Sequence, residues 1–592
     1  MSIIVQKFGG TSVADSNKIL AAARKAIRAQ EEGHQVVMVV SAMGKNTDKL
    51  IALAKEIEEN PPAREMDMLL STGEQVSVAL VAIAIQHLGY KAVSMTGAQI
   101  GIKTNNSFMK ARIESISTDR IRKALNDGNI VIAAGFQGVD DNYNITTLGR
   151  GGSDTTAVAL AAVLNAESCE IYTDVDGVYT ADPRVVPKAR RVKQISYDEM
   201  LEMASLGAGV MHSRSIEFAK NFQVPIHVRA SYSDEPGTMI VSEPESTERP
   251  VCGAAIAKDE VRFSIVGIAD RPGMTDQIFH PIANRQIAMD MVVQNIGIDG
   301  KAEIAFTIPA TELSSTLKAI AEVKENIPDA FESYTYDNNL CKVSIVGLGM
   351  ERQVGVAEKM FETLAARGIN IQMITTSEIK VSVLVSKDQG AEAIRAVHDA
   401  FELGVTPSDV KPLVKPPMIS DEEKIRLINR LEHMEDLLIE NVTLDETQAS
   451  VTLFDLPQEP GLASRIFRRV TEAGIVVDMI VQSSGDKFTN LTFTVERSCA
   501  DAALELAKEI AAKLGCTPPK ACPPVAKISL SGTGMRSHTL VAARILETLA
   551  ESGINIEMIN TSEMRFNLVV EAKDGQRALA VLKDELKDVI AD

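Results

Sequence analysis

The C-terminal half of this 592-residue chain contains a repeat, and the repeat constrains the fold more than any other feature. Pro272-Gly273 and Gln294 recur 188 positions later, and Asn370-Ile371 recurs 185 positions later. The second copies are Pro460-Gly461, Gln482 and Asn555-Ile556. A segment that recurs with its spacing nearly intact folds in the same way each time, so residues 260–410 predict a module that is present twice.

Each copy divides once more into two similar parts. Gly273 aligns with Gly355 and Ile287 with Ile369, both at a displacement of 82 positions. Four units are too few and too dissimilar for a solenoid. We therefore predict four small βαββαβ units, named unit 1 to unit 4, at residues 260–336, 337–412, 437–515 and 523–592. A linker at 411–417 and a charged helix starting near Ser420 are predicted between the copies.

Residues 1–240 follow another pattern, in which β-branched runs alternate with segments of helical periodicity. This alternation predicts an α/β domain with a largely parallel sheet and helices on both faces. Turn formers at 233–237 and 242–246 mark its end. The clearest strands are Val36–Val40, Ile130–Ala134 and Glu170–Thr173, and the clearest helices are Lys18–Glu31, Glu74–His87 and Asp154–Leu164.

Net charge and cysteine usage exclude several classes of function. The formal charge of −19 would repel nucleic acid and anionic membrane surfaces, so we expect a small-molecule partner. The six cysteines form no C-x-x-C pair, and we expect them to be reduced and structural. No secretory signal and no uninterrupted apolar run of membrane-spanning length is visible, so we expect a cytoplasmic protein.

Two glycine-containing loops in the first domain have the character of anion sites. Residues 7–12, Lys-Phe-Gly-Gly-Thr-Ser, follow a predicted strand and precede a helix, and residues 149–156 combine glycines, hydroxyls and Arg150 ahead of another helix. Backbone N–H groups at a helix start, together with a cation, suit phosphate or carboxylate. Either loop alone could be a tight turn, but two in one domain favour a phosphate-bearing substrate with a second anion.

A third segment, residues 173–184, follows a strand directly and is rich in aspartate. Asp-Gly and Asp-Pro are common in surface turns. Loops at the carboxyl ends of strands in open α/β sheets usually line ligands, which favours a binding role.

Taken together, these segments, with Val40–Gly44 and Ser71–Glu74, resemble aspartate kinases of the amino-acid kinase superfamily. The resemblance implies phosphoryl transfer from ATP, with Mg²⁺, to the side-chain carboxylate of aspartate. Lys7 and Asp154 would be catalytic. The implied ATP-binding residues are Lys7, Phe8, Gly9, Gly10, Ser41, Thr173, Asp174, Tyr179, Asp182 and Arg184. The implied aspartate-binding residues are Thr47, Glu74, Arg150, Gly151, Gly152 and Ser153.

One position departs from the family pattern. Relatives commonly carry lysine where this chain has Gly209, so a nucleotide-side lysine is missing there. No general base is needed, because an aspartate carboxylate with a reference pKa of about 3.9 is already a nucleophile at neutral pH.

The four repeated units resemble ACT domains, which pair side by side and bind amino acids between them. The resemblance implies lysine, threonine or both as feedback inhibitors, and assembly through edge strands favours a homodimer. The same residues could instead be turn formers and edge polars. The implied effector residues are Met274, Thr275, Asp276, Asp290 and Gln294 of unit 1, Asn370, Ile371 and Thr376 of unit 2, Ala463, Asp478 and Gln482 of unit 3, and Asn555, Ile556 and Thr561 of unit 4.

Two alternatives stay open. The chain could be another kinase of the same fold, acting on acetylglutamate, glutamate or a nucleoside monophosphate, but Glu74, Arg150 and the 173–184 segment argue against this. It could also be a non-catalytic amino-acid sensor, which the intact Lys7 and Asp154 disfavour.

Overall fold

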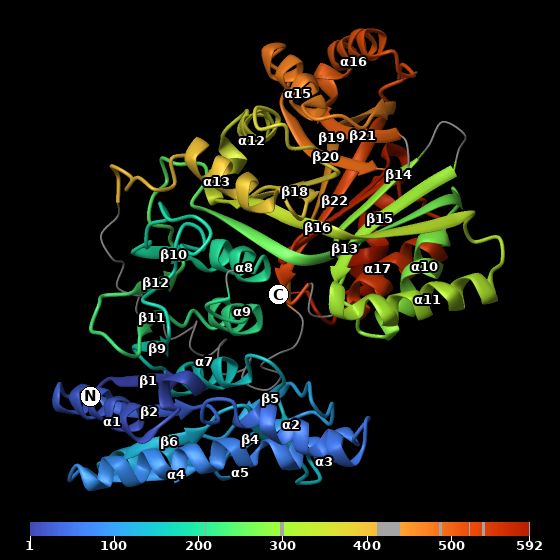
Figure 1. Cartoon of the computed structure of the whole chain (residues 1–592). Coiled ribbons are helices and arrows are strands. Elements are labelled where there is room, and N and C mark those ends of the chain that lie inside the picture. Colours follow the sequence, from blue (N-terminus) through green and yellow to red (C-terminus); the bar gives the residue numbers. More distant parts are fainter. Residues whose placement is uncertain are drawn as a thin grey trace.

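A computed structural model describes residues 1–207, 209–296, 301–410, 438–484, 488–519, 521–535 and 539–590. The predicted linker at 411–417 and the charged helix near Ser420 lie outside these residues. The N-terminal domain lies on one side of the molecule and the repeated units lie on the other (Figure 1).

The N-terminal domain contains an eight-stranded sheet in the order β10-β12-β11-β9-β1-β2-β6-β3. All its pairs are parallel except β11 with β12, as the alternating pattern predicts. The strands are β1 Ile3–Phe8, β2 Gln35–Val40, β3 Ala92–Met95, β6 Ile130–Ala134, β9 Ser168–Thr173, β10 Gln194–Ser196, β11 Ile226–Ala230 and β12 Thr238–Val241.

Helices cover both faces of this sheet because successive side chains of each strand point to opposite sides. Phe8, Met38 and Val40 pack under α1 and α4, whereas Val37 and Val39 pack under helices of the other face. The domain's helices are α1 Ser16–Glu31, α2 Asn46–Ile57, α3 Ala63–Leu70, α4 Thr72–His87, α5 Gly97–Ile100, α6 Asp119–Asn126, α7 Gly152–Leu164, α8 Tyr197–Ser205 and α9 Ser213–Asn221. A small second sheet pairs β5 Ile113–Ile116, β4 Ile102–Thr104, β7 Gln137–Val139 and β8 Ile145–Thr147.

One helical run, residues 63–87, is long and apolar enough to cross a membrane by length and composition alone. Slightly more than half of its apolar window, 56%, is buried inside the fold, where Val81 and Ile85 pack against the sheet. The run comprises α3 and α4, and its apolar composition is explained by the packing of α4 against the sheet.

The repeated units share one twelve-stranded sheet, in the order β14-β15-β13-β16-β18-β17-β20-β21-β19-β22-β24-β23. The strands are β13 Gly253–Ala269, β14 Asp290–Ile296, β15 Lys301–Pro309, β16 Ser333–Val346, β17 Met373–Ser377, β18 Lys380–Ser386, β19 Leu438–Pro457, β20 Val477–Ser484, β21 Phe488–Glu496, β22 Pro524–Thr533, β23 Met558–Thr561 and β24 Arg565–Glu571. The helices are α10 Met274–Asn284, α11 Leu313–Asn326, α12 Val356–Ala365, α13 Gly390–Ala400, α15 Leu462–Glu472, α16 Ala500–Leu514, α17 Thr539–Glu551 and α18 Gly575–Glu585.

Two long strands serve more than one unit each. Gly253–Ala257, at the start of β13, pairs with Lys342–Val346 of β16 in unit 2, whereas the rest of β13 belongs to unit 1. Unit 1 is therefore inserted into unit 2, and a boundary at residue 336 runs through β16. In the second copy, β19 pairs with β22 along its first part and with β21 along its last part.

The units associate in pairs within the chain. Helices α10 and α17 pack together, joining unit 1 to unit 4, and α12 packs on α15, joining unit 2 to unit 3. Strand β17 pairs with β20, so the edge strands of units 2 and 3 satisfy each other. The expectation that such edges would bind a second chain therefore does not hold for this pair.

Candidate active site

Four adjacent parallel strands bring the predicted site loops to one edge of the sheet. Phe8 of β1 pairs with Tyr172 of β9 and with Val40 of β2, and Ala134 ends β6 beside Val40. The loops that follow these strands therefore start side by side at the carboxyl edge, where open α/β sheets bind ligands. The predicted segments 7–12, 40–44 and 173–184 are brought together there.

Lys7 and Asp154 form the centre of this edge. The Nζ atom of Lys7 lies 2.5 Å from Oδ1 of Asp154, and both side chains are almost completely buried. The Lys7 Nζ also lies above Gly9, 3.7 Å from where a side-chain Cβ would stand. A lysine held in this way presents a fixed positive charge to an anion bound over the glycines.

Gly10 is required by close packing of two loops. A Cβ at this position would lie only 2.5 Å from the carbonyl oxygen of Ala42. The Gly44 N–H donates to the Gly10 carbonyl at 2.9 Å, and the Ser41 N–H donates to the Phe8 carbonyl at 3.1 Å. The loop after β2 is thus fixed against the loop after β1, which places Ser41 near the Lys7 centre.

Glu74 is buried with one oxygen unused. Its Oε1 accepts a hydrogen bond from the Ala42 N–H at 3.0 Å, while Oε2 is buried and accepts none. Burial raises the pKa of this carboxyl to about 7. A buried carboxylate with a free oxygen is a ready partner for an ammonium group.

The loop before α7 carries Arg150 between two glycines. Gly149 and Gly151 have φ values of 77° and 76°, a left-handed conformation that favours glycine. Arg150 is exposed, Ser153 is buried against Gly135, and Gly152 begins α7. Thr47 is half-buried on α2.

The segment after β9 forms its own network of polar contacts. The Thr173 hydroxyl donates to Asp174 at 3.1 Å, and the Tyr179 hydroxyl donates to Asp176 at 3.0 Å. Arg184 lies 2.8 Å from Asp182, and this contact lowers the pKa of the Asp182 carboxyl. Gly209 lies in the exposed turn between α8 and α9.

Comparisons with known proteins agree with this geometry. Residues 2–230 match the Amino acid kinase family, and residues 343–401, 455–509 and 528–586 match an ACT domain. An aspartokinase from Geobacillus stearothermophilus is 50% identical over 404 residues, which cover 68% of this chain and 98% of the relative. The Pseudomonas aeruginosa aspartokinase is 50% identical over 406 residues, with the same coverages.

The chain belongs to the aspartokinase family. It is therefore a kinase, an enzyme of phosphoryl transfer.

Solved aspartokinase structures have the same fold. The crystal structure of aspartate kinase from Synechocystis is 39% identical, covers 99% of this chain and 98% of its own, and has a TM-score of 0.52. Escherichia coli aspartokinase III in complex with aspartate and ADP is 25% identical, covers 67% of this chain and 99% of its own, and has a TM-score of 0.58. The same enzyme has also been solved with lysine and aspartate.

The predicted effector residues of this aspartokinase gather at two interfaces. Between units 1 and 4, the Gln294 side chain donates to the Ile556 carbonyl at 2.6 Å, and the Thr275 hydroxyl donates to Gln294 at 2.9 Å. Between units 2 and 3, Gln482 reaches the Ile371 carbonyl at 3.4 Å beside a pocket. That pocket is also lined by Asn370, Gly461 and Ala463.

Other predicted effector residues are already engaged inside the protein. Asp290 lies 2.5 Å from the buried Lys342, and Asp478 forms an ion pair with Lys527. The side chain of Met274 is buried in the core. Thr376 accepts a hydrogen bond from the Ile480 N–H at 2.9 Å, and Thr561 lines a second pocket together with Asp290.

Sequence reasoning missed Asp67 and Arg214. Asp67 is fully buried and accepts hydrogen bonds from the Thr147 hydroxyl at 2.6 Å and from the Met109 N–H at 3.0 Å, so it fixes the segment that leads to Arg150. These side chains act through backbone groups far away in the sequence, so no local spacing marks them.

Proposed function

We propose that this enzyme transfers the γ-phosphoryl group of ATP to the side-chain carboxylate of L-aspartate, giving ADP and 4-phospho-L-aspartate. This would be the first step toward lysine, threonine and methionine, and we propose that it takes place in the cytoplasm. The observation that carries the proposal is the buried, half-satisfied Glu74, which bonds to Ala42 in the loop that packs on Gly10, at the sheet edge that also carries the Lys7–Asp154 pair. This edge would supply one site for an α-ammonium and another for a phosphoryl group.

The residues of the chain would act by positioning and charge. Glu74 would hold the aspartate ammonium, and Arg150 would bind a carboxylate through two parallel hydrogen bonds. Lys7 and the N–H groups of Gly9 and Gly10 would hold the transferring group in line with the acceptor oxygen. No proton has to be removed from the acceptor, because it is already ionised.

Asp154 fits a role beside Mg²⁺. Within the described residues, no group of three or more His, Cys, Asp or Glu side chains could hold a metal ion alone. Mg²⁺ that accompanies ATP needs fewer, because one or two carboxylates and phosphate oxygens usually bind it. When bound, the ion would neutralise phosphate charge, and Asp154 would also keep Lys7 in place.

The deciding experiment is an ADP-release assay over several acceptors. We expect turnover with aspartate and little or none with glutamate, acetylglutamate or a nucleoside monophosphate. Preference for any of these would transfer the assignment to another kinase of the same fold. Absence of turnover with all four would favour the amino-acid sensor.

We further propose that lysine and threonine inhibit the enzyme at the 1–4 and 2–3 interfaces. Both are expected to inhibit more strongly together than alone. The two interfaces hold equivalent glutamines, Gln294 and Gln482, which makes each substitution a control for the other. Gln294→Ala and Gln482→Ala are each expected to raise the half-inhibitory concentration of one effector about tenfold, the loss of roughly one hydrogen bond.

Inhibition curves for each effector, in each variant, provide the measurement. Equal loss of response to both effectors in both variants would contradict separate sites. Inhibition of the parent enzyme by neither amino acid would contradict the regulatory proposal.

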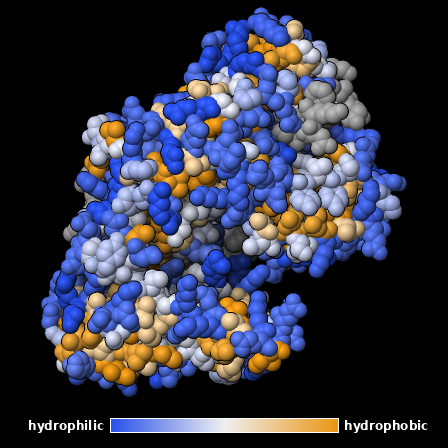
Figure 2. Space-filling model, in the orientation of Figure 1, coloured by the Kyte–Doolittle hydropathy of each residue, from blue (hydrophilic) through white to orange (hydrophobic). Residues whose placement is uncertain are grey.

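We also propose a homodimer, formed through the N-terminal domain. Val76, Leu80 and Ile83 lie on one face of α4 at helical spacing, and these residues are 50%, 38% and 60% exposed. Figure 2 shows hydrophobic side chains along this edge of the molecule. A single apolar stripe can meet its own copy across a twofold axis.

Light scattering after size exclusion would measure the assembly. The parent chain is expected at twice its chain mass, and Leu80→Glu at the mass of one chain. Tyr143→Glu, at an exposed aromatic residue elsewhere, is the control and should leave the dimer intact. A dimer that survives Leu80→Glu would exclude this surface.

A further inference from the structure

Helix α9 begins beside the loop that carries Arg150. The Arg214 guanidinium donates from Nη1 to the Leu148 carbonyl at 2.6 Å and from Nη2 to the Ala111 carbonyl at 2.7 Å. Leu148 and Ala111 are fully buried. Because the guanidinium is a rigid planar fork, these two bonds fix the start of the Arg150 loop relative to the small sheet.

His212 supports the same loop from its other side. A Cβ on Gly151 would lie 2.3 Å from the His212 Cβ, so the two residues are in direct contact. The His212 Nδ1 also accepts a hydrogen bond from the Arg214 N–H and caps α9. The first turn of α9 and the Arg150 loop therefore form one packed unit.

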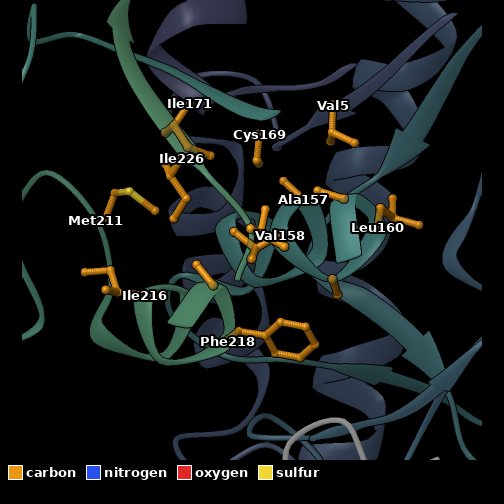
Figure 3. Close-up of a cluster of buried hydrophobic side chains, with 14 of the residues drawn as sticks. Val5, Ala157, Val158, Leu160, Cys169, Ile171, Met211, Ile216, Phe218 and Ile226 are labelled. Carbon is orange, nitrogen blue, oxygen red and sulfur yellow. The ribbon is translucent and has the colours of Figure 1, made fainter. Parts of the chain in front are cut away.

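The body of α9 packs on α7, whose first turn carries Ser153 and Asp154. Ile216 and Phe218 of α9 belong to the same buried cluster as Val158 of α7, which Figure 3 draws. All three side chains are buried. Close-packed interiors transmit displacement instead of absorbing it. A shift of α9 therefore moves the first turns of both α7 and α9, which lie at the active site.

The other end of α9 is attached to the regulatory units. The Thr533 hydroxyl donates to Oδ1 of Asn221 at 2.6 Å, and Lys220 lies 3.3 Å from Glu440 of β19. Thr533 is the last residue of β22, where unit 4 turns toward its helix α17. One helix thus contacts the Arg150 loop at its start and unit 4 at its end.

We propose that Arg214 is a positioning residue for aspartate, and that α9 couples unit 4 to the Arg150 loop. The first part rests on the proposed binding of aspartate by Arg150, and the second part rests on the proposed feedback function. Nine residues of α-helix span roughly 13 Å as a stiff rod, so a displacement of β22 reaches the loop through one element. Coupling of this kind needs one element whose position both sites bias, and α9 contacts both.

Kinetics of Arg214→Gln and Arg214→Lys test the first part. Arg214→Gln is expected to raise the KM for aspartate about tenfold or more, because Arg150 loses its fixed position. The KM for ATP should stay within about twofold, since the nucleotide segment follows β9. Arg214→Lys keeps the charge and one bond, and should fall between parent and Gln. An equal rise in both KM values, or none, would overturn the positioning role.

Asn221→Ala and Thr533→Val test the coupling. Both are expected to leave kcat and KM without effector unchanged and to raise the half-inhibitory concentrations at least fivefold. Effector binding measured by calorimetry should persist, and added aspartate should no longer weaken it, because linkage acts in both directions. Lys188→Ala is the control. It breaks another contact between the N-terminal domain and the repeated units, the 3.1 Å ion pair of Lys188 with Asp399, which lies away from α9.

The outcomes separate the two proposals. Normal inhibition in Asn221→Ala would overturn coupling through α9 while the feedback function stands. A parent enzyme that neither lysine nor threonine inhibits would overturn the feedback function and the coupling with it. The Arg214 kinetics decide the positioning role in either case.

Discussion

Lys7→Ala is expected to lower turnover by about 10³-fold or more while the protein keeps its fold. The Lys7 ammonium lies beside Gly9, one of the glycines that would hold the transferring phosphoryl group, and 2.5 Å from Asp154. Removing one fixed charge or hydrogen-bond donor from a transition state of this kind costs on the order of 10²–10⁵ in rate. The measurement is kcat with saturating ATP and aspartate.

The substitution also leaves Asp154 as a buried carboxylate without its cation. This costs a few kcal/mol of stability, so a lower melting temperature is expected, with a folded spectrum. Adding Asp154→Asn should recover the melting temperature without recovering turnover. Lys25→Ala removes another ion-paired lysine, 3.0 Å from Asp234, and should leave kcat near normal. Turnover of Lys7→Ala within tenfold of the parent would refute the assigned role.

Glu74→Gln is expected to raise the KM for aspartate about 10²-fold. Truncating or neutralising one partner of a buried charge pair typically costs about 2–5 kcal/mol. The Gln side chain can still accept the hydrogen bond from Ala42, so the loop should keep its shape. Glu65→Gln, at an exposed glutamate on the neighbouring α3, is the matched control.

The pH profile gives a second test of Glu74. Its pKa of about 7 means that the free enzyme loses the carboxylate as pH falls, so kcat/KM for aspartate should be about tenfold lower at pH 6 than at pH 8. The Gln variant should lack this limb, which separates Glu74 from other groups that titrate nearby. An unchanged acid limb in the variant would assign the dependence to another group.

The raised pKa of Glu74 also makes the stability of the fold depend on pH. The folded-state pKa of Glu74, about 7, lies above the unfolded value of 4.5, so ionisation opposes folding. The stability contributed by the protonated form is lost as pH rises from 4.5 to 7. At pH 8 the free energy of unfolding of Glu74→Gln should therefore exceed that of the parent by up to about 3 kcal/mol, and its melting temperature should be higher. The variant should nevertheless bind aspartate poorly.

Local patterns in the sequence predict the elements but not their partners. The strand Val36–Val40 and the helices ending at Glu31, His87 and Leu164 are confirmed, because each has an uninterrupted periodicity. Which of the four units pair with each other could not be predicted from the sequence. Units 1 and 3 carry the same local pattern. No local feature therefore indicates that unit 1 pairs with unit 4 and unit 3 with unit 2.

The residues of the candidate site also divide into those that local motifs predict and those that they do not. Lys7, Glu74 and Asp154 lie in short motifs with glycines or helix starts, and the structure brings them to one edge. Arg214 acts by holding two main-chain carbonyls, at Leu148 and Ala111, and any sequence can present a carbonyl. Residues that position backbone are therefore invisible to motif reasoning, even when they touch the site's loops.

The insertion of unit 1 within unit 2 determines where this protein can be cut or recombined. Removing residues 260–336 alone would sever β13 and β16 in mid-strand and expose their ladders. A swap that exchanges 253–401 or 438–590 as one block keeps each long strand with its main partners. Chimeras of regulatory modules should therefore be joined between the two copies, and never between units 1 and 2.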